Sequence, residues 1–236
     1  MKLIIFDLDQ TLVDFLDIHN LTTKALFKEY FGLEANLTEI DFAGRSLLDN
    51  LAALAKLKGV PETLFNQKSQ TILQSYETIF AEMLPEDGSK HILPGVQRLL
   101  DALSEGDYML ALYTGDSPGI VKSVLAVTKL DNYFKLVVTS NQAESRVGMA
   151  RLAVERAMKL SSSTFRNSDV VIIGDSIHDI ECGKQLNALT IAVATGSHSK
   201  SRLLQSKPDF LFQDLRDYQG VLKAIDAYRK EELMTR

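Results

Sequence analysis

The chain alternates short apolar runs with segments of helical periodicity, and this alternation constrains its fold more than any other feature of the sequence. Short continuous apolar runs are typical of parallel strands that are buried on both faces. Strands that alternate with helices predict an α/β domain built on a mostly parallel sheet. The expected strands are Leu3–Phe6, Met109–Tyr113, Leu136–Thr139, Val170–Ile173, Thr190–Ala194 and, more weakly, Asp209–Phe212.

The distance between the first two apolar runs is anomalous, because about a hundred residues separate Phe6 from Met109 and a crossover needs only roughly a dozen. We interpret residues 15–90 as a helical insert and residues 1–14 and 91–236 as the α/β core. An insert at this edge of a parallel sheet lies over the carboxyl ends of the strands, where such folds bind ligands. The helices expected in the insert are Thr22–Phe31, Ser46–Lys58 and Pro61–Met83, with Gly32 and Gly59 as C-terminal caps. Those expected in the core are Gly95–Ser104, Pro118–Val127, Gly148–Lys159, His178–Leu186 and Leu215–Lys230.

Composition excludes several classes of protein. The 236 residues carry a net charge of −5 and no basic stripe, so we expect no nucleic-acid partner. No stretch approaches the roughly 18 apolar residues of a membrane span, and Asp7 interrupts the N-terminal apolar run too early for a signal peptide. A single cysteine, Cys182, allows no disulfide within the chain. We therefore expect a cytoplasmic protein, either a monomer or a homodimer.

Acidic residues follow two of the predicted strands directly. Asp7 and Asp9 end the first strand, and Asp175 and Asp179 follow the fourth. Because the carboxyl ends of parallel strands meet at one edge, we expect these four carboxylates to lie close together. Such a cluster requires either protonation or a bound cation. All-oxygen ligation favours Mg²⁺, whereas zinc would favour histidine and cysteine ligands, and the four histidines of this chain show no such spacing.

Other strand ends supply groups that bind anions. Thr114 offers a hydroxyl and Gly115 a backbone N–H, just before a predicted helix whose N-terminus favours negative charge. Arg146 follows the third strand and adds a cation that can turn back toward the strand ends. Together with a metal, these groups are suited to holding a phosphoryl group. Arg151 is a competing cation, but it lies farther along the following helix.

These motifs, in this order, resemble those of the haloacid dehalogenase superfamily of phosphatases. The matching elements are DLDQT at 7–11, Thr114, Arg146 and GDSIHD at 174–179, and residues 15–90 resemble the helical cap of phosphoglycolate phosphatases and β-phosphoglucomutases. The resemblance implies a Rossmann-like parallel sheet core with an inserted α-helical cap domain. Gln10 departs from the family pattern, because glycine is frequent at that position.

The resemblance also implies roles for the acidic residues. Asp7 would be the nucleophile that forms an aspartyl-phosphate. Asp9 would be the general acid toward the leaving oxygen and then the general base for water. Mg²⁺ would be held by Asp7, the backbone carbonyl of Asp9, and Asp175. Asp179 would act as a ligand through water or would orient the others.

Four further residues would bind the phosphoryl group or its substrate. Thr114 and the Gly115 amide would bind phosphate oxygens, and Arg146 would neutralise charge on Asp7 and the phosphoryl group. Arg45 stands in a Gly-Arg-Ser element that resembles one facing the active site in related caps, and an ordinary loop arginine is an equal alternative.

Several other polar residues have simpler interpretations. Asp14 and Asp116 are expected to be turn or helix-capping residues. His19, Lys24 and Lys28 are expected on a solvated helix face rather than in the cleft.

Taken together, these features predict a Mg²⁺-dependent phosphomonoester hydrolase that acts on a small phosphorylated metabolite. Asp9 disfavours a dehalogenase, because a departing halide needs no acid. A sugar phosphomutase of the β-phosphoglucomutase type is the alternative, since it would use the same phospho-aspartate. A non-catalytic phospho-acceptor module is less favoured, because such domains lack a helical insert.

Overall fold

The computed structural model describes residues 1–234, in which six parallel strands form one sheet in the order β3-β2-β1-β4-β5-β6. All six predicted strands are confirmed, and so is the α/β fold class. The strands are β1 (Lys2–Phe6), β2 (Tyr108–Thr114), β3 (Leu136–Thr139), β4 (Val170–Gly174), β5 (Leu189–Val193) and β6 (Phe210–Phe212).

The predicted helices are confirmed, with shifts at their ends. The helices are α1 (Leu16–Phe31), α2 (Leu47–Leu57), α3 (Glu62–Met83), α4 (Val96–Ser104), α5 (Pro118–Thr128), α6 (Arg146–Ser161), α7 (Ile177–Leu186), α8 (Lys200–Gln205) and α9 (Tyr218–Met234). Short 3₁₀ turns occupy Leu37–Glu39, Ser89–His91, Asp131–Tyr133, Ser140–Gln142 and Asn167–Asp169. The six-residue helix α8 was not predicted, because so short a segment shows little periodicity. None of the helices in the described part of the chain is both long and apolar enough to cross a membrane.

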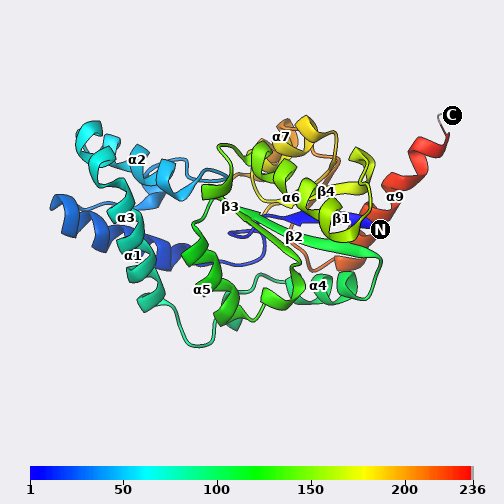
Figure 1. Ribbon diagram of the computed structural model, residues 1–236, viewed down its shortest axis with the longest axis horizontal. Helices are drawn as coiled ribbons and strands as arrows, with labels where there is room; N and C mark the ends of the chain where they lie inside the picture. Colours follow the sequence, from blue (N-terminus) through cyan, green and yellow to red (C-terminus); the bar gives the residue numbers. More distant parts are fainter. Residues whose placement is uncertain (235–236) are drawn as a thin grey trace.

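Helices cover both faces of the sheet, so the α/β core has three layers (Figure 1). Leu3 and Ile5 of β1 belong to a buried cluster on the face covered by α6. Ile4 and Phe6 belong to the larger cluster on the opposite face, where α4 and α9 pack. Strands with apolar residues on both faces are expected in a parallel sheet, and this explains why the strand sequences show no polar alternation.

The order of the strands reverses between β1 and β4. From β1 the chain proceeds outward through β2 to β3, and from β4 it proceeds in the other direction through β5 to β6. The two crossovers leave the β1–β4 boundary on opposite sides, which opens a crevice at the carboxyl ends of these strands. Asp7 and Asp175, the first residues after β1 and β4, therefore lie at the mouth of this crevice.

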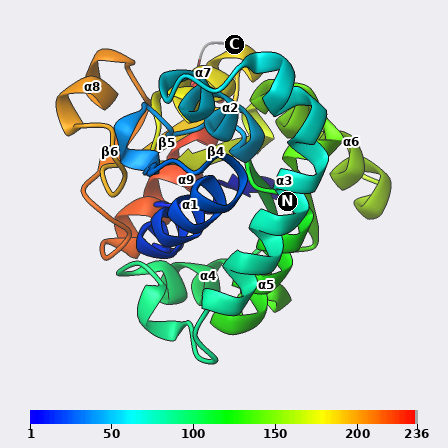
Figure 2. The same cartoon turned by 90° about the vertical axis from the view of Figure 1, so that its left-hand side faces the viewer.

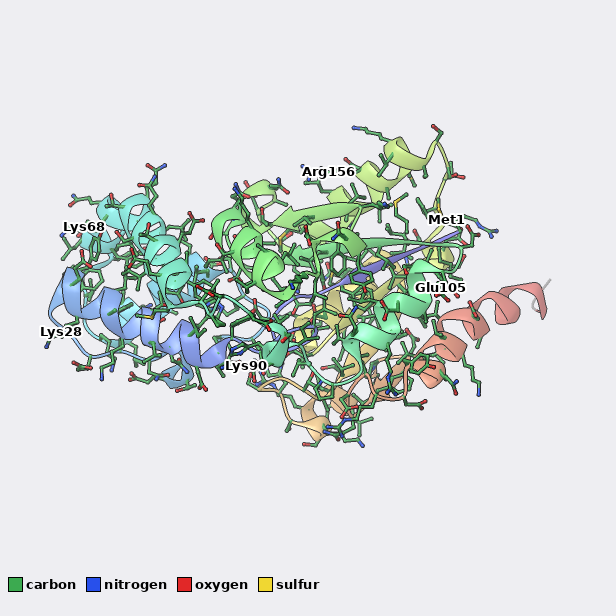
Figure 3. The ribbon with its side chains drawn as sticks, turned by 90° about the horizontal axis from the view of Figure 1, so that it is seen from below. Met1, Lys28, Lys68, Lys90, Glu105 and Arg156 are labelled. Carbon is green, nitrogen blue, oxygen red and sulfur yellow. The ribbon has the colours of Figure 1, made fainter. Side chains whose placement is uncertain are left out.

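The helices α1, α2 and α3 form a group beside the carboxyl edge of the sheet (Figure 1). Viewed from that side, they lie in front of the strands (Figure 2). Lys28 of α1 and Lys68 of α3 lie at the opposite end of the molecule from Met1, which precedes β1 (Figure 3). Gly32 caps α1 in the left-handed conformation, with φ of 69°, as predicted.

Candidate active site

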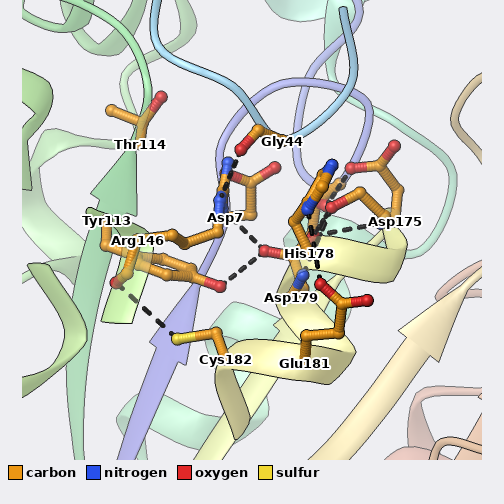
Figure 4. Close-up of polar contacts among 12 residues, drawn as sticks. Asp7, Gly44, Tyr113, Thr114, Arg146, Asp175, His178, Asp179, Glu181 and Cys182 are labelled. Atoms are coloured by element: carbon orange, nitrogen blue, oxygen red, sulfur yellow. Dashed lines mark hydrogen bonds and ion pairs between the residues drawn. The ribbon is translucent and has the colours of Figure 1, made fainter. Parts of the chain in front are cut away.

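Asp7 and Arg146 form the centre of the site. The N–H of Asp7 donates to the carbonyl of Ile173 at 2.9 Å, which holds Asp7 between β1 and β4. Nη1 of Arg146 donates to Oδ1 of Asp7 at 2.9 Å and to Oδ1 of Asp179 at 2.6 Å (Figure 4). Arg146 is the first residue of α6, two residues before the predicted start of that helix, and its side chain is only 9% exposed.

The aromatic ring of Tyr113 stacks against the Arg146 guanidinium. The guanidinium lies 4.7 Å from the centre of the Tyr113 ring, and the Tyr113 hydroxyl donates to Asp179 (Figure 4). Such stacking suits the planar arginine better than it would suit lysine. Sequence reasoning missed Tyr113, because an aromatic residue within an apolar strand run has the signature of a core residue.

Asp179 is saturated with hydrogen bonds. Besides Arg146 and Tyr113, it accepts from the Ser176 hydroxyl at 2.5 Å and from the Ser176 N–H at 3.0 Å. Asp175 accepts from the Thr11 hydroxyl at 3.2 Å, so a residue of the first motif helps to hold a residue of the last. Of these two carboxylates, Asp175 lines the cavity and Asp179 lies behind it, buried beside Arg146.

The buried carboxylates fit a cation. Oxygens of Asp7, Asp175 and Asp179 all lie within 4.8 Å of one another, and Arg146 is the cation bonded to two of them. Burial, reinforced by the charges of Asp179 and Asp9 against the opposing effect of Arg146, raises the pKa of Asp7 from 3.8 to about 7. Burial and the neighbouring charge of Asp7 likewise raise the pKa of Asp175 well above 3.8. A divalent cation with oxygen ligands would remove this excess of negative charge.

Thr114 and Gly115 lie on the wall of the same cavity. The Thr114 Oγ1 accepts from the N–H of Asp116 at 3.1 Å, which leaves its own proton for another acceptor. The N-terminus of α5, expected to attract the substrate, instead receives Glu77 of α3, whose carboxylate accepts from Gly119 N–H at 3.1 Å. This contact joins the helical insert to the core.

Asp9 lies beside two residues that the sequence interpretation misplaced. His19 was expected on a solvated helix face and Asp116 at a turn or helix cap, but both are buried and line the cavity. A ring nitrogen of His19 and carboxyl oxygens of Asp9 and Asp116 lie within 4.8 Å of one another. The prediction for His19 was wrong. Asp116 does lie in the bend before α5, but the burial of its carboxyl group beside Asp9 was not expected. A single acid or histidine carries no local signal of what the insert will place opposite it.

Asp9 and Asp116 have pKa values that move in opposite directions. Burial, followed by the charge of Asp9, raises the pKa of Asp116 well above 3.8. Burial also opposes ionisation of Asp9, but hydrogen bonding and charge from His19, with a hydrogen bond from Asp116, hold the pKa of Asp9 below 3.8. These shifts favour the ionised form of Asp9 and the protonated form of Asp116.

The insert closes tightly over this edge of the core. Leu47 N–H donates to the carbonyl of Gly115 at 2.9 Å, and Nε of Arg146 donates to the carbonyl of Gly44 at 3.1 Å. A Cβ at Gly115 would lie 2.1 Å from the Arg45 carbonyl oxygen, so only glycine permits this approach. The Arg45 side chain is exposed at the cavity wall, and its Nη2 lies 3.4 Å from the Asp49 carbonyl.

Comparison with known families identifies the family of this chain. A sequence model of haloacid dehalogenase-like hydrolases matches residues 4–193, which include Asp7, Asp9, Thr114, Arg146, Asp175 and Asp179. The chain belongs to this family. It is therefore a hydrolase of the haloacid dehalogenase-like type, and the resemblance inferred from the four motifs is confirmed.

Individual relatives are distant but cover nearly the whole chain. The pyrophosphatase PpaX of Listeria innocua is 26% identical over 222 residues, which are 93% of this chain and 95% of the relative. A probable phosphatase, IndB, of Dickeya dadantii is 24% identical and covers 94% of each chain. These relatives are phosphatases or pyrophosphatases by name.

Solved structures share the fold. A β-phosphoglucomutase from Clostridium difficile superposes with a TM-score of 0.80 at 15% identity, covering 97% of this chain and 99% of that one. A predicted phosphoglycolate phosphatase from Haemophilus somnus superposes with a TM-score of 0.76 at 21% identity, covering 94% and 98% of the two chains.

Gln10, the departure from the family pattern noted in the sequence, adopts a left-handed backbone conformation. Its φ of 60° lies in the left-handed region that glycine adopts without strain. In this chain the conformation is supported by local bonds. The Gln10 side chain donates to Asp14 at 2.6 Å, and the Gln10 carbonyl accepts from the Thr195 hydroxyl. Asp14 also accepts from Leu16 N–H at 3.1 Å, which confirms its predicted role at the start of α1.

Replacing Arg146 by methionine is expected to reduce turnover by about 10²–10³-fold, because it removes a preorganised positive charge beside Asp7. It should also lower the free energy of unfolding at pH 8 by about 3–5 kcal/mol, since two buried carboxylates lose their partner. Arg151→Met is the matched control, because Arg151 is exposed on the same helix. Steady-state kinetics and denaturant unfolding measure both effects, and the reverse ranking of the two variants would show that Arg151 is the relevant cation.

The metal-free protein is expected to lose stability as the pH rises from about 4 to about 7. Asp7, Asp116 and Asp175 have raised pKa values in the fold, so between the unfolded and folded pKa the native state holds more protons than the unfolded state. Each extra proton lowers the free energy of unfolding by about 1.4 kcal/mol per pH unit. Asp9 has a lowered pKa, so it changes the free energy of unfolding only below about pH 4.

Thermal unfolding in EDTA at a series of pH values measures this effect. Excess Mg²⁺ at pH 8 should raise the midpoint, because a ligand that binds only the folded state stabilises it. A flat profile from pH 4 to 7, with no response to Mg²⁺, would contradict the proposed crowding of carboxylates.

Proposed function

We propose that this protein is a Mg²⁺-dependent phosphomonoester hydrolase that acts on a small phosphorylated metabolite through an aspartyl-phosphate on Asp7. The observation that carries the proposal is the placement of the Asp7 carboxylate. It is held by Arg146 at 2.9 Å, lies beside the buried Asp175, and faces a cavity that Thr114 and Asp9 also line. A nucleophile, a cation, a hydroxyl donor and an acid therefore converge on one space.

The residues that would hold Mg²⁺ are Asp7, Asp175 and the backbone carbonyl of Asp9. Asp179 already accepts four hydrogen bonds, so its role is to orient Arg146 or to reach the ion through water. When bound, the metal supplies positive charge to a phosphoryl oxygen and to the carboxylates around it.

The remaining chemistry belongs to side chains and backbone of the chain. A carboxylate oxygen of Asp7 attacks phosphorus, the bond from phosphorus to the leaving oxygen breaks, and Asp9 gives that oxygen a proton. Burial raises the pKa of the neighbouring Asp116, which favours a proton beside Asp9. In the second step Asp9 takes a proton from water, the water oxygen attacks phosphorus, and inorganic phosphate and free Asp7 result. Thr114 and the Gly115 amide hold the phosphoryl oxygens.

The helical insert would act as a cap domain. We propose residues 15–90 as this cap and residues 1–14 and 91–236 as the catalytic core. The cavity beneath the cap is lined by residues of both the insert and the core and opens to solvent, which suits a small ligand. Direct bonds from the insert to Gly115 and Arg146 would exclude bulk water while the phospho-aspartate exists.

The test is release of inorganic phosphate by the purified full chain from a panel of phosphomonoesters that includes a generic aryl phosphate. We expect release in Mg²⁺ and none in EDTA. Absence of Mg²⁺-dependent release from every ester would refute the proposal. Phosphorus NMR of sugar phosphates distinguishes a mutase, which would move the phosphoryl group to a new position rather than release it.

A further inference from the structure

The loop that follows β5 packs against the acidic residues that follow β4. A Cβ on Gly196 of this loop would lie 1.7 Å from Oδ2 of Asp175, so only glycine leaves room for that carboxylate. Two residues later, His198 is only 2% exposed, which is unusual burial for a histidine. It lies beyond the residues that the family model matches, which end at 193. The proposed hydrolysis steps leave His198 without a role.

His198 accepts a hydrogen bond at the start of α7. The N–H of Ile177, the first residue of that helix, donates to Nδ1 of His198 at 3.1 Å. The first N–H groups of a helix have no acceptor within the helix, so His198 supplies one from another part of the core. Because a backbone N–H can only donate, Nδ1 holds a lone pair, and Nε2 of the neutral ring carries the proton.

The other ring nitrogen of His198 connects to the insert. Its Nε2 donates to Oδ1 of Asp41 at 3.3 Å, and Asp41 lies between the 3₁₀ turn Leu37–Glu39 and α2. Oδ2 of Asp41 accepts from Arg202 of α8 at 2.9 Å, so two side chains of the core hold this carboxylate. One imidazole ring therefore joins the insert to the first turn of α7.

The first turn of α7 also holds the acidic residues that follow β4. Ser176 is the N-cap of the helix, and both its hydroxyl and its N–H donate to Asp179. Asp175 directly precedes Ser176, so a shift of this turn would move both carboxylates. Gly44 of the insert lies over the same turn (Figure 4), where a Cβ would be 2.6 Å from the Ser176 hydroxyl oxygen. The insert thus contacts this turn directly and also reaches it through a side chain.

We propose that His198 is a positioning residue, which holds the first turn of α7 in the place that Asp41 of the docked insert sets. This inference rests on the proposed phosphatase function and adds a residue that positions Asp175 and Asp179 in the same site. Because the imidazole ring is rigid, displacement of Asp41 turns the ring and weakens its bond to Ile177. A small misplacement of catalytic groups can cost as much as about 10²-fold in rate.

Two substitutions separate the roles of the two ring nitrogens. The asparagine amide of His198→Asn can take the place of Nδ1 and accept from Ile177, but it is too short to reach Asp41. The glutamine amide of His198→Gln can take the place of Nε2, but it leaves the Ile177 N–H without this acceptor. We expect His198→Gln to speed amide hydrogen exchange at Ile177, followed by NMR, by about tenfold or more, and His198→Asn to speed it by no more than about threefold.

The same two variants should separate kcat from KM with a phosphomonoester substrate. His198→Gln should lower kcat by about tenfold or more, because the start of α7 loses its position. His198→Asn should keep kcat and raise KM by about threefold or more, because the insert closes less firmly over the cavity. A merely structural role of His198 would instead lower kcat in both variants in proportion to their loss of stability, which denaturant unfolding measures.

Asp41→Ala tests the connection without changing a buried side chain, because Asp41 is exposed. It should speed exchange at Ile177 and raise KM by about threefold each, because His198 loses its anchor. It should add nothing in the His198→Asn protein, since that asparagine does not reach position 41. Glu34→Ala is the matched control and should change neither quantity, because Glu34 is an exposed acid of the insert whose ion pairs join it to lysines of α1.

Equal exchange at Ile177 in the wild type and in His198→Gln, or equal losses of kcat in the two His198 variants, overturns the inference. If the His198 variants do not fold, Asp41→Ala decides, and an unchanged rate of exchange at Ile177 rejects the connection. If the purified chain hydrolyses no phosphomonoester, the proposed function fails. The exchange rates still show in that case whether His198 holds the start of α7 and whether Asp41 sets its place.

Discussion

Asp7→Asn is expected to abolish phosphate release, with a loss on the order of 10⁴-fold or more, because an amide cannot serve as the nucleophile that starts the two-step reaction. The change is nearly isosteric, and it removes one negative charge from a buried cluster of carboxylates. The variant should therefore fold, and in EDTA at pH 8 it should be at least as stable as the wild type. Inactivity would then report chemistry rather than unfolding.

Asp14→Asn provides the matched control for this experiment. Asp14 follows the same motif by three residues, but it is exposed and holds the turn before α1. We expect it to retain most of the turnover. Phosphate release and mass spectrometry of the intact protein measure the outcome. An Asp7→Asn protein with more than about a tenth of wild-type activity would exclude an obligatory phospho-aspartate at this residue.

Asp9→Asn is expected to slow turnover by about 10²–10⁴-fold, the span typical for loss of a general acid–base group. The two steps should respond differently when the leaving group is a nitrophenolate. Such a group departs without a proton, so phosphorylation of Asp7 should continue. Attack by water should stall, because the base is absent. We expect a rapid burst of one equivalent of nitrophenol followed by slow release.

Rapid mixing and mass spectrometry of the quenched protein distinguish this result from a general defect. The trapped protein should carry one phosphate on Asp7. Asp17→Asn is the control, because Asp17 is an exposed acid on the first turn of α1. If the Asp9→Asn variant is slow and shows no burst, Asp9 acts before phosphorylation. If the variant keeps full activity, another group is the acid–base catalyst.

The positions of Asp7 and Asp175 could be predicted from the sequence, because they depend only on which strands are neighbours in the sheet. Once β1 and β4 are parallel and adjacent, the residues that follow them must meet at one edge. Arg146 was harder, since the predicted helix began at Gly148 and left Arg146 in a loop, whereas Arg146 is the first residue of α6 and donates to Asp7. Tyr113 was missed, because its polar end becomes visible only when Arg146 and Asp179 pack on the α6 face of β2.

His19 and Asp116 show the opposite case. Both lie within unremarkable local sequence, one on an amphipathic helix and one before a helix start. Their burial together with Asp9 depends on how the insert docks on the core. Bonds such as those from Leu47 to Gly115 and from Arg146 to Gly44 hold that docking. No periodicity or spacing rule relates His19 to Asp116, because 96 residues of chain lie between them.

The sequence by itself determined the parallel α/β fold, the helices between β1 and β2, and the order of the four motifs that identify the hydrolase family. These features follow from local periodicity and from the rule that parallel strand ends share an edge. Only the tertiary structure decided that Asp116 and His19 join Asp9 in a buried cluster and that Asp179 lies behind Asp7. The physical reason is that burial and partnering are properties of packed surfaces, and the surface that the insert presents to the core is set by docking rather than by local sequence.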